Sequence, residues 1–179
     1  AYNGADDRCE VRAGDLRDAS VISEAATFDL VTGTPPYFPP GNGTVSSRPQ
    51  CGPCRFEERG GIEDYCRAAA RLLAPHGLFA CCFVARFPGR VNVAAVAAGL
   101  RITSQLDVVP RTGRAPLFTL FAMSHLRAPA SAPASALFSS PISSVSPCLR
   151  GESSLHTPLV VRARTGQWTP DFLALRAAM

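Results

Sequence analysis

The sequence contains no lysine, so all 18 basic side chains are arginine, and the formal net charge is +4. Arginine binds phosphate through paired hydrogen bonds and stacks on bases, so contact with nucleic acid would explain this bias. A genome rich in GC codons is the simpler explanation. The charge alone does not separate the two.

Long apolar runs are also missing. None approaches the roughly 18 residues that a membrane-spanning helix needs, so we expect no membrane partner. No signal peptide is visible. Because the chain begins with Ala1 rather than Met, we expect the native amino terminus, with any targeting signal, to lie upstream of an intracellular protein.

The seven cysteines give no sign of a metal site or of a disulfide framework. Cys51 and Cys54 form a single CxxC in what reads as a loop. The sequence has neither a second CxxC nor a close histidine pair to complete a tetrahedral zinc site, so we expect no metal. The strand-then-helix context of a thioredoxin-like redox motif is missing too. Cys81 and Cys82 read as small core residues within an apolar run.

The most informative stretch runs from Phe28 to Gly41, FDLVTGTPPYFPPG. Its first residues are apolar and rich in strand formers. Gly33 allows a bend, and the prolines that follow end any ladder pairing. The stretch therefore predicts a buried strand whose carboxyl end holds Thr34 and Tyr37 rigidly, at the edge of the sheet where ligands of open α/β folds sit.

A rigid turn of this kind suits a planar amine or amide. The Pro35 carbonyl and the Thr34 side chain can accept its N–H groups, and the aromatic of Tyr37 can stack on its face. The alternative is a turn that only terminates a strand.

The motif resembles the (Asn/Asp/Ser)-Pro-Pro-(Tyr/Phe) motif of Rossmann-like, S-adenosylmethionine (SAM)-dependent amino-methyltransferases. With Phe38, it is most similar to bacterial-type tRNA adenine-N6-methyltransferases that modify the base next to the anticodon of a valine tRNA.

The resemblance implies a role for each residue of the turn. Thr34, Pro35, Pro36 and Tyr37 would form the catalytic turn, with Thr34 also near the cofactor SAM. Tyr37, Phe38 and Arg55 would contact the tRNA substrate. Thr34 departs from the family, which usually has Asn there, and a hydroxyl does not reproduce the amide's separate donor and acceptor.

Gly14-Asp15-Leu16 is similar to the end of the family's third strand. The resemblance implies that Asp15, beside Leu16, accepts from the adenine amino group of SAM. The competing interpretation is an aspartate that caps the next turn.

The rest of the chain alternates between predicted strands and helices. We expect strands at 9–13, 78–84, 102–109, 117–123 and 158–164, and helices at 16–26, 62–73, 91–100 and from 170. The 78–84 run is continuously apolar, which predicts burial on both faces. Glu63, Arg67 and Arg71 are spaced for i,i+4 pairs. The 102–109 and 117–123 strands match the late antiparallel hairpin of the resembled fold.

The resemblance implies one α/β domain in three parts: 1–127, a disordered Ala/Ser/Pro-rich insertion at 128–150, and a final strand and helix at 151–179. No Gly-rich turn follows a first strand, as SAM binding in such a domain requires. We therefore expect the first strands of the sheet to precede Ala1.

Three functions follow for comparison. The first is methyl transfer from SAM to adenine N6 of tRNA. The second is methylation of a glutamine side chain in a protein release factor. The third is a non-catalytic RNA-binding relative, which Thr34 in place of Asn permits. The oligomeric state is not predicted.

Overall fold

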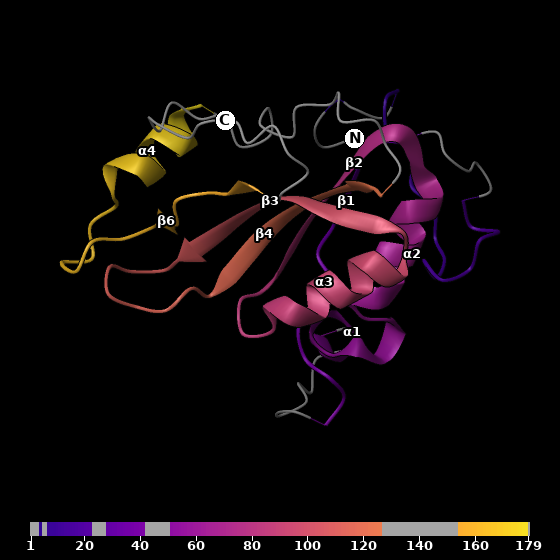
Figure 1. Ribbon diagram of the computed structural model, residues 1–179, viewed down its shortest axis with the longest axis horizontal. Helices are drawn as coiled ribbons and strands as arrows, with labels where there is room; N and C mark the ends of the chain where they lie inside the picture. The colour runs from indigo at the N-terminus through magenta and orange to yellow at the C-terminus, as the bar shows by residue number, and fades with distance from the viewer. Residues whose placement is uncertain (1–3, 5–6, 23–27, 42–50, 127–153, 179) are drawn as a thin grey trace.

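The computed structural model describes residues 4, 7–22, 28–41, 51–126 and 154–178. Its sheet has the strand order β1-β2-β4-β3-β5, with β6 also pairing with β3 (Figure 1). The strands are β1 (Phe28–Gly33), β2 (Leu73–Val84), β3 (Leu100–Val109), β4 (Phe118–His125), β5 (Ser154–Leu155) and β6 (Leu159–Val160). β1 and β2 are parallel, β4 is antiparallel to both β2 and β3, and β5 and β6 are parallel to β3.

The helices are α1 (Cys51–Arg55), α2 (Ile62–Leu72), α3 (Pro88–Ala97) and α4 (Pro170–Ala177), with a 3-10 turn at Glu57–Arg59. α2 and α3 lie together on one side of the sheet, while α4 lies at the far end beside β6 (Figure 1). The β3–β4 hairpin, the Phe28 strand and the two central helices confirm the corresponding predictions of secondary structure. The prediction that the Phe28 strand is buried was wrong: Phe28 and Leu30 are exposed, because β1 is an edge strand of the sheet.

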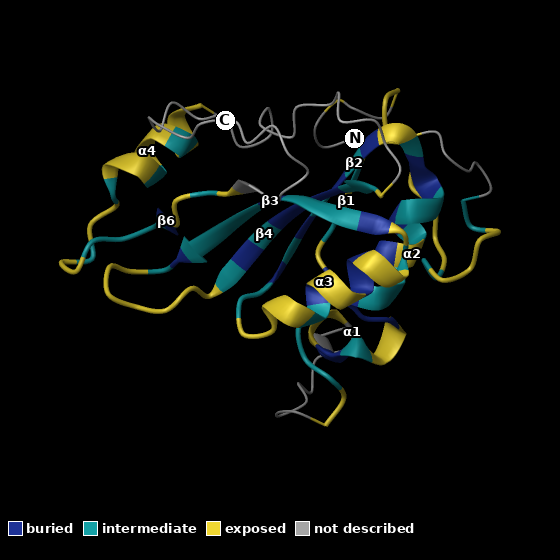
Figure 2. Cartoon of the chain, in the orientation of Figure 1, coloured by how far each residue is buried: buried dark blue, intermediate teal, exposed yellow. Residues whose placement is uncertain are grey.

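The core lies between α2, α3 and one face of the sheet. α2 buries Ile62, Cys66 and Ala69, whose spacing places them on one helical stripe. They meet the buried rings of Phe79 and Phe121 from β2 and β4. Figure 2 shows this buried surface continuing from α2 into the central strands.

The other face of the sheet is less buried. Along β2 the burial alternates, so Cys81 and Phe83 are buried while Cys82 and Val84 are half-buried. The prediction that this strand is buried on both faces was therefore wrong. The apolar character of the run reflects residue type, whereas burial depends on which face α2 and α3 cover.

The predicted ion pairs on α2 were also wrong. Arg67 pairs with Asp64, and Arg71 donates to the Ile22 carbonyl oxygen at 2.5 Å. Glu63 instead binds Arg90, at 2.7 Å. Arg67 therefore pairs with a neighbour at i,i+3, whereas Arg71 and Glu63 bind residues far away in the sequence, which local spacing rules do not foresee.

The segment before β1 differs from expectation as well. Residues 9–13 are exposed and join no strand, and residues 16–22 form turns rather than a helix. Cys51 and Cys54 lie in α1, not in a loop. The expected insertion at 128–150 lies outside the described residues.

Within the described ranges, no helix is long and apolar enough to cross a membrane. The same part of the chain holds no group of three His, Cys, Asp or Glu side chains that could bind a metal ion.

Candidate functional site at the carboxyl end of β1

Gly33 and the two prolines fix the turn that follows β1. A Cβ on Gly33 would lie 2.8 Å from the Tyr65 ring of α2, so a side chain there would force this ring to move. Pro35 and Pro36 are buried, whereas Thr34 is exposed between Gly33 and this rigid pair. None of the described residues hydrogen-bonds the Thr34 hydroxyl. The turn therefore holds an available hydroxyl group on a backbone with little freedom.

Tyr37 anchors the turn on the sheet. Its ring is half-buried, edge-on to Phe83 at 6.0 Å between centroids and tilted against Phe118 at 5.3 Å. Its hydroxyl donates to the Cys82 sulfur at 3.7 Å. Burial is the main reason that the pKa of Tyr37 lies above its ordinary value, and the hydrogen bond to Cys82 raises this pKa further. Tyr37 is therefore neutral, and part of its surface remains open to a ligand.

Phe38 continues the chain toward a second short segment. Its N–H donates to the Arg55 carbonyl oxygen at 3.3 Å, and the Glu57 N–H donates to the Phe38 carbonyl oxygen at 3.0 Å. The rings of Phe38 and Phe56 lie 6.4 Å apart. The Arg55 guanidinium stands 5.5 Å from the centre of the Phe38 ring. The structure thus brings together Thr34 through Phe38 and Arg55, all of which the sequence singled out.

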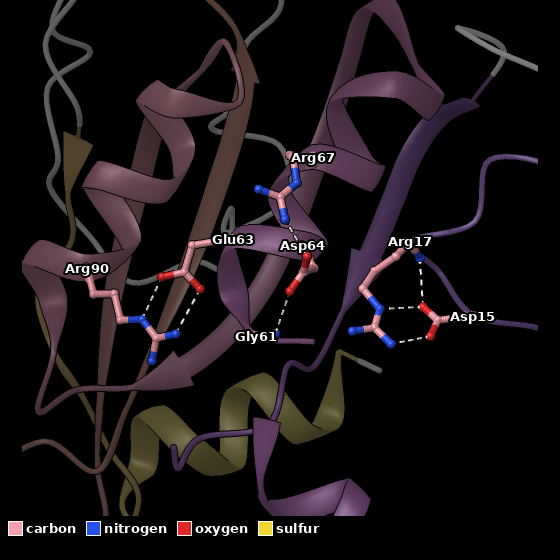
Figure 3. A network of polar contacts seen from close by, with 7 residues as sticks. All are labelled: Asp15, Arg17, Gly61, Glu63, Asp64, Arg67 and Arg90. Carbon is pink, nitrogen blue, oxygen red and sulfur yellow. Dashed lines mark hydrogen bonds and ion pairs between the residues drawn. The ribbon is translucent and has the colours of Figure 1, made fainter. Parts of the chain in front are cut away.

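Asp15 and Leu16 lie in the segment before β1, where Leu16 is half-buried in a turn. The Asp15 carboxylate accepts from the Arg17 backbone N–H and from its guanidinium, at 2.9 and 2.5 Å (Figure 3). These bonds lower the pKa of Asp15 to about 2. Among the described residues, no hydrogen bond or ion pair joins Asp15 to the turn at 34–38. The carboxylate is ionised and exposed enough to meet a ligand, but Arg17 holds it at present.

Two hollows flank the turn. The first, the strand-end pocket, has a volume of about 420 Å³ and is lined by Thr32, Thr34, Ala80, Cys82 and Leu120. The second, the hairpin pocket, has a volume of about 530 Å³. Its walls include Phe38, Pro88 and Leu117, and its polar groups are Arg86, Gln105, Asp107 and Thr119. Phe38 links the second pocket to the turn.

Sequence reasoning missed the polar groups of the hairpin pocket. Gln105 and Asp107 read as ordinary members of a strand, and Thr119 read as part of an apolar one. The available signal was the alternation of polar residues, Gln105 and Asp107, near the carboxyl end of β3. Their convergence depends on the β3–β4 register, in which Asp107 faces Thr119.

Comparison with known proteins shows the fold. No protein-family model matches the chain, and no curated protein sequence matches it significantly. The crystal structure of a predicted O-methyltransferase, protein Atu636 from Agrobacterium tumefaciens, superposes with a TM-score of 0.58 at 15% identity. The match covers 92% of this chain but 62% of that one, so this chain spans less than two thirds of the matched structure.

A second structure, M1.HpyAVI in complex with SAM, matches with a TM-score of 0.30 and 16% identity over 36% of this chain and 38% of that one. The first match and the mixed sheet together show a Rossmann-like SAM-methyltransferase fold with a late antiparallel hairpin.

Proposed function

We propose that this protein is a SAM-dependent methyltransferase that acts on an exocyclic amine, namely adenine N6 of a tRNA. The observation that carries this proposal is the exposed Thr34 hydroxyl on the buried Pro35-Pro36 turn, at the carboxyl end of a parallel strand. Ligands of open α/β sheets bind at this edge. Support comes from the fold and from the likeness to the structure of a predicted O-methyltransferase.

The described residues fit the methyl-bearing end of the cofactor. The strand-end pocket is walled by the small or apolar side chains Ala80, Cys82 and Leu120, and it opens beside Thr34. Asp15 would accept from the adenine amino group, in exchange for its bonds to Arg17. When bound, SAM supplies an electrophilic methyl group.

The chain's own residues would position the acceptor amine. The Thr34 hydroxyl and the Pro35 carbonyl accept its two N–H groups, which turns the nitrogen lone pair out of conjugation with the ring. Tyr37 and Phe38 hold the ring by its face, and Arg55 meets a backbone phosphate. No side chain needs to act as a general base before methyl transfer, because positioning and exclusion of water lower the barrier.

The test uses the full-length gene product, radiolabelled SAM and total RNA from the source organism. Label recovered as N6-methyladenosine after nuclease digestion is the expected result. Bound SAM with no label in RNA would contradict the RNA substrate, and label in a protein glutamine would move the assignment to release-factor-type chemistry. Absence of SAM binding would favour a non-catalytic RNA-binding protein.

A further inference from the structure

The hairpin pocket combines an aromatic wall with two hydrogen-bonding side chains from one strand. Gln105 and Asp107 are two residues apart on β3, so they point to the same face of the sheet. Both are half-buried, and both line the pocket with Phe38. An amide that can donate and a carboxylate that can accept therefore stand side by side next to a ring.

Asp107 is held in place by a buried neighbour. Thr119 is 1% exposed, and its hydroxyl donates to Oδ1 of Asp107 at 2.6 Å. Within the described residues, this is the only hydrogen bond of the Asp107 side chain. Oδ2 therefore remains available as an acceptor, on a carboxylate whose orientation is fixed.

The hairpin pocket is separate from the place where the amine would react. β1, which Thr34 directly follows, and β3, which carries Asp107, are three strand steps apart in the order β1-β2-β4-β3. Three steps correspond to roughly 14 Å across the sheet. One base does not span both places, and Phe38, four residues after Thr34 in the chain, lines the hairpin pocket.

We propose that the hairpin pocket binds a second nucleobase of the RNA, next to the methylated one, and selects bases that carry an exocyclic amino group. This inference rests on the proposed function. The amino group donates to Oδ2 of Asp107, the Gln105 amide donates to a ring acceptor, and Phe38 packs on the ring face. Arg86, exposed at the rim of the same pocket, meets the adjoining phosphate.

A binding experiment tests the pocket without cofactor or turnover. AMP, CMP, GMP and UMP are titrated separately into the protein, and NMR follows the Gln105 side-chain amide and the backbone amides around Asp107 and Thr119. We expect the three amino-bearing nucleotides to bind about tenfold more tightly than UMP, since UMP offers Asp107 no amino group and its ring N3–H lies between two carbonyl oxygens that repel the carboxylate. Equal binding of all four, or no binding at these signals, would overturn the proposal.

Two variants and a control sharpen this test. Asp107→Asn should abolish the preference over UMP, and Thr119→Val should weaken it because the carboxylate loses its orientation. Thr119→Val keeps the carboxylate, so it remains informative if Asp107→Asn fails to fold. Asp171→Asn, which removes an exposed carboxylate from α4, should leave the preference unchanged. Retention of the full preference in Asp107→Asn would contradict the subsite.

Methyl transfer to short RNAs that differ only in the neighbour of the target adenine separates the two proposals. If wild type methylates these RNAs and Asp107→Asn shows the same neighbour preference, the subsite is wrong and the proposed function stands. If no RNA is methylated while the nucleotides bind with the expected preference, the proposed function fails and the pocket remains a base-selective site.

Discussion

Arg90 and Glu57 form a two-point ion pair, with Nη1 donating to Oε1 at 2.7 Å and Nη2 to Oε2 at 2.9 Å. The same guanidinium also binds the Glu63 carboxylate on α2 (Figure 3). Glu57 also donates its backbone N–H to the Phe38 carbonyl oxygen. The ion-pair cluster therefore connects α2 and α3 to Phe38, the aromatic residue that lines the hairpin pocket. Arg90 therefore positions Phe38 through Glu57.

Replacing Arg90 by Ala should destabilise the protein. The Glu57 carboxylate has a side-chain exposure of 9%, so losing its partner leaves a charge with little access to water. We expect a loss of about 2 kcal/mol, less than for a fully buried pair because Arg90 is partly exposed. Urea unfolding followed by circular dichroism measures it. Arg67→Ala is the control: it removes an arginine that is 67% exposed and should change the free energy by under about 0.5 kcal/mol.

The Phe28 strand, α2, α3 and the β3–β4 hairpin could be predicted because their signals are local. Ile62, Cys66 and Ala69 repeat at helical spacing, and Gly33 with Pro35 ends a strand in any context. α4 belongs to the same group, since Thr169 and Pro170 mark a helix start.

The ion pairs and the polar groups of the hairpin pocket could not be predicted, because they depend on tertiary contacts. Arg90 lies 33 residues from Glu57, so no spacing rule could pair them. The polar groups of the hairpin pocket meet only through the β3–β4 register, which shifts by a bulge between Ile102 and Ser104. Of the candidate site, sequence alone could place the turn at 34–38, because five consecutive residues need no fold to be neighbours.

The start of α4 offers a local test of helix capping. Thr169 accepts the Phe172 N–H through its hydroxyl oxygen at 3.3 Å and donates to the Val160 carbonyl oxygen. Thr169→Ala should cost about 1 kcal/mol of α4 stability, as N-cap losses do. Faster hydrogen exchange confined to 170–177 is the expected reading. Thr169→Ser keeps the hydroxyl and should exchange like wild type, and equal exchange in Thr169→Ala would refute the cap.

Asp15 should titrate far below an ordinary aspartate. Its folded pKa of about 2 lies below the reference value of 3.8, chiefly because of the side-chain hydrogen bond from Arg17. A lowered folded pKa means that the interaction is fully present above pH 3.8 and is lost as the pH falls through about 2. NMR titration of the carboxyl carbon checks this. Arg17→Ala should return the pKa toward the reference value, and an unchanged pKa would rule out Arg17 as the cause.

Thr34 decides whether the turn can orient an amine. If its hydroxyl accepts one N–H of the substrate, Thr34→Ala should lower kcat of methyl transfer by about a hundredfold, the usual effect of removing one positioned hydrogen-bonding group from a reacting centre. Thr34→Ser keeps the hydroxyl and should retain most activity. Thr34→Asn restores the side chain that the resembled family uses, so kcat should equal or exceed that of wild type.

Folding does not confound this comparison, because Thr34 is exposed and none of the described residues hydrogen-bonds its hydroxyl. All three variants should unfold at the same urea concentration as wild type. Thr165→Ala, at another exposed threonine in the turn before α4, serves as the matched control and should leave kcat unchanged. A Thr34→Ala variant with wild-type kcat would mean that the Pro35 carbonyl alone orients the amine, so Thr34 would have no part in the reaction.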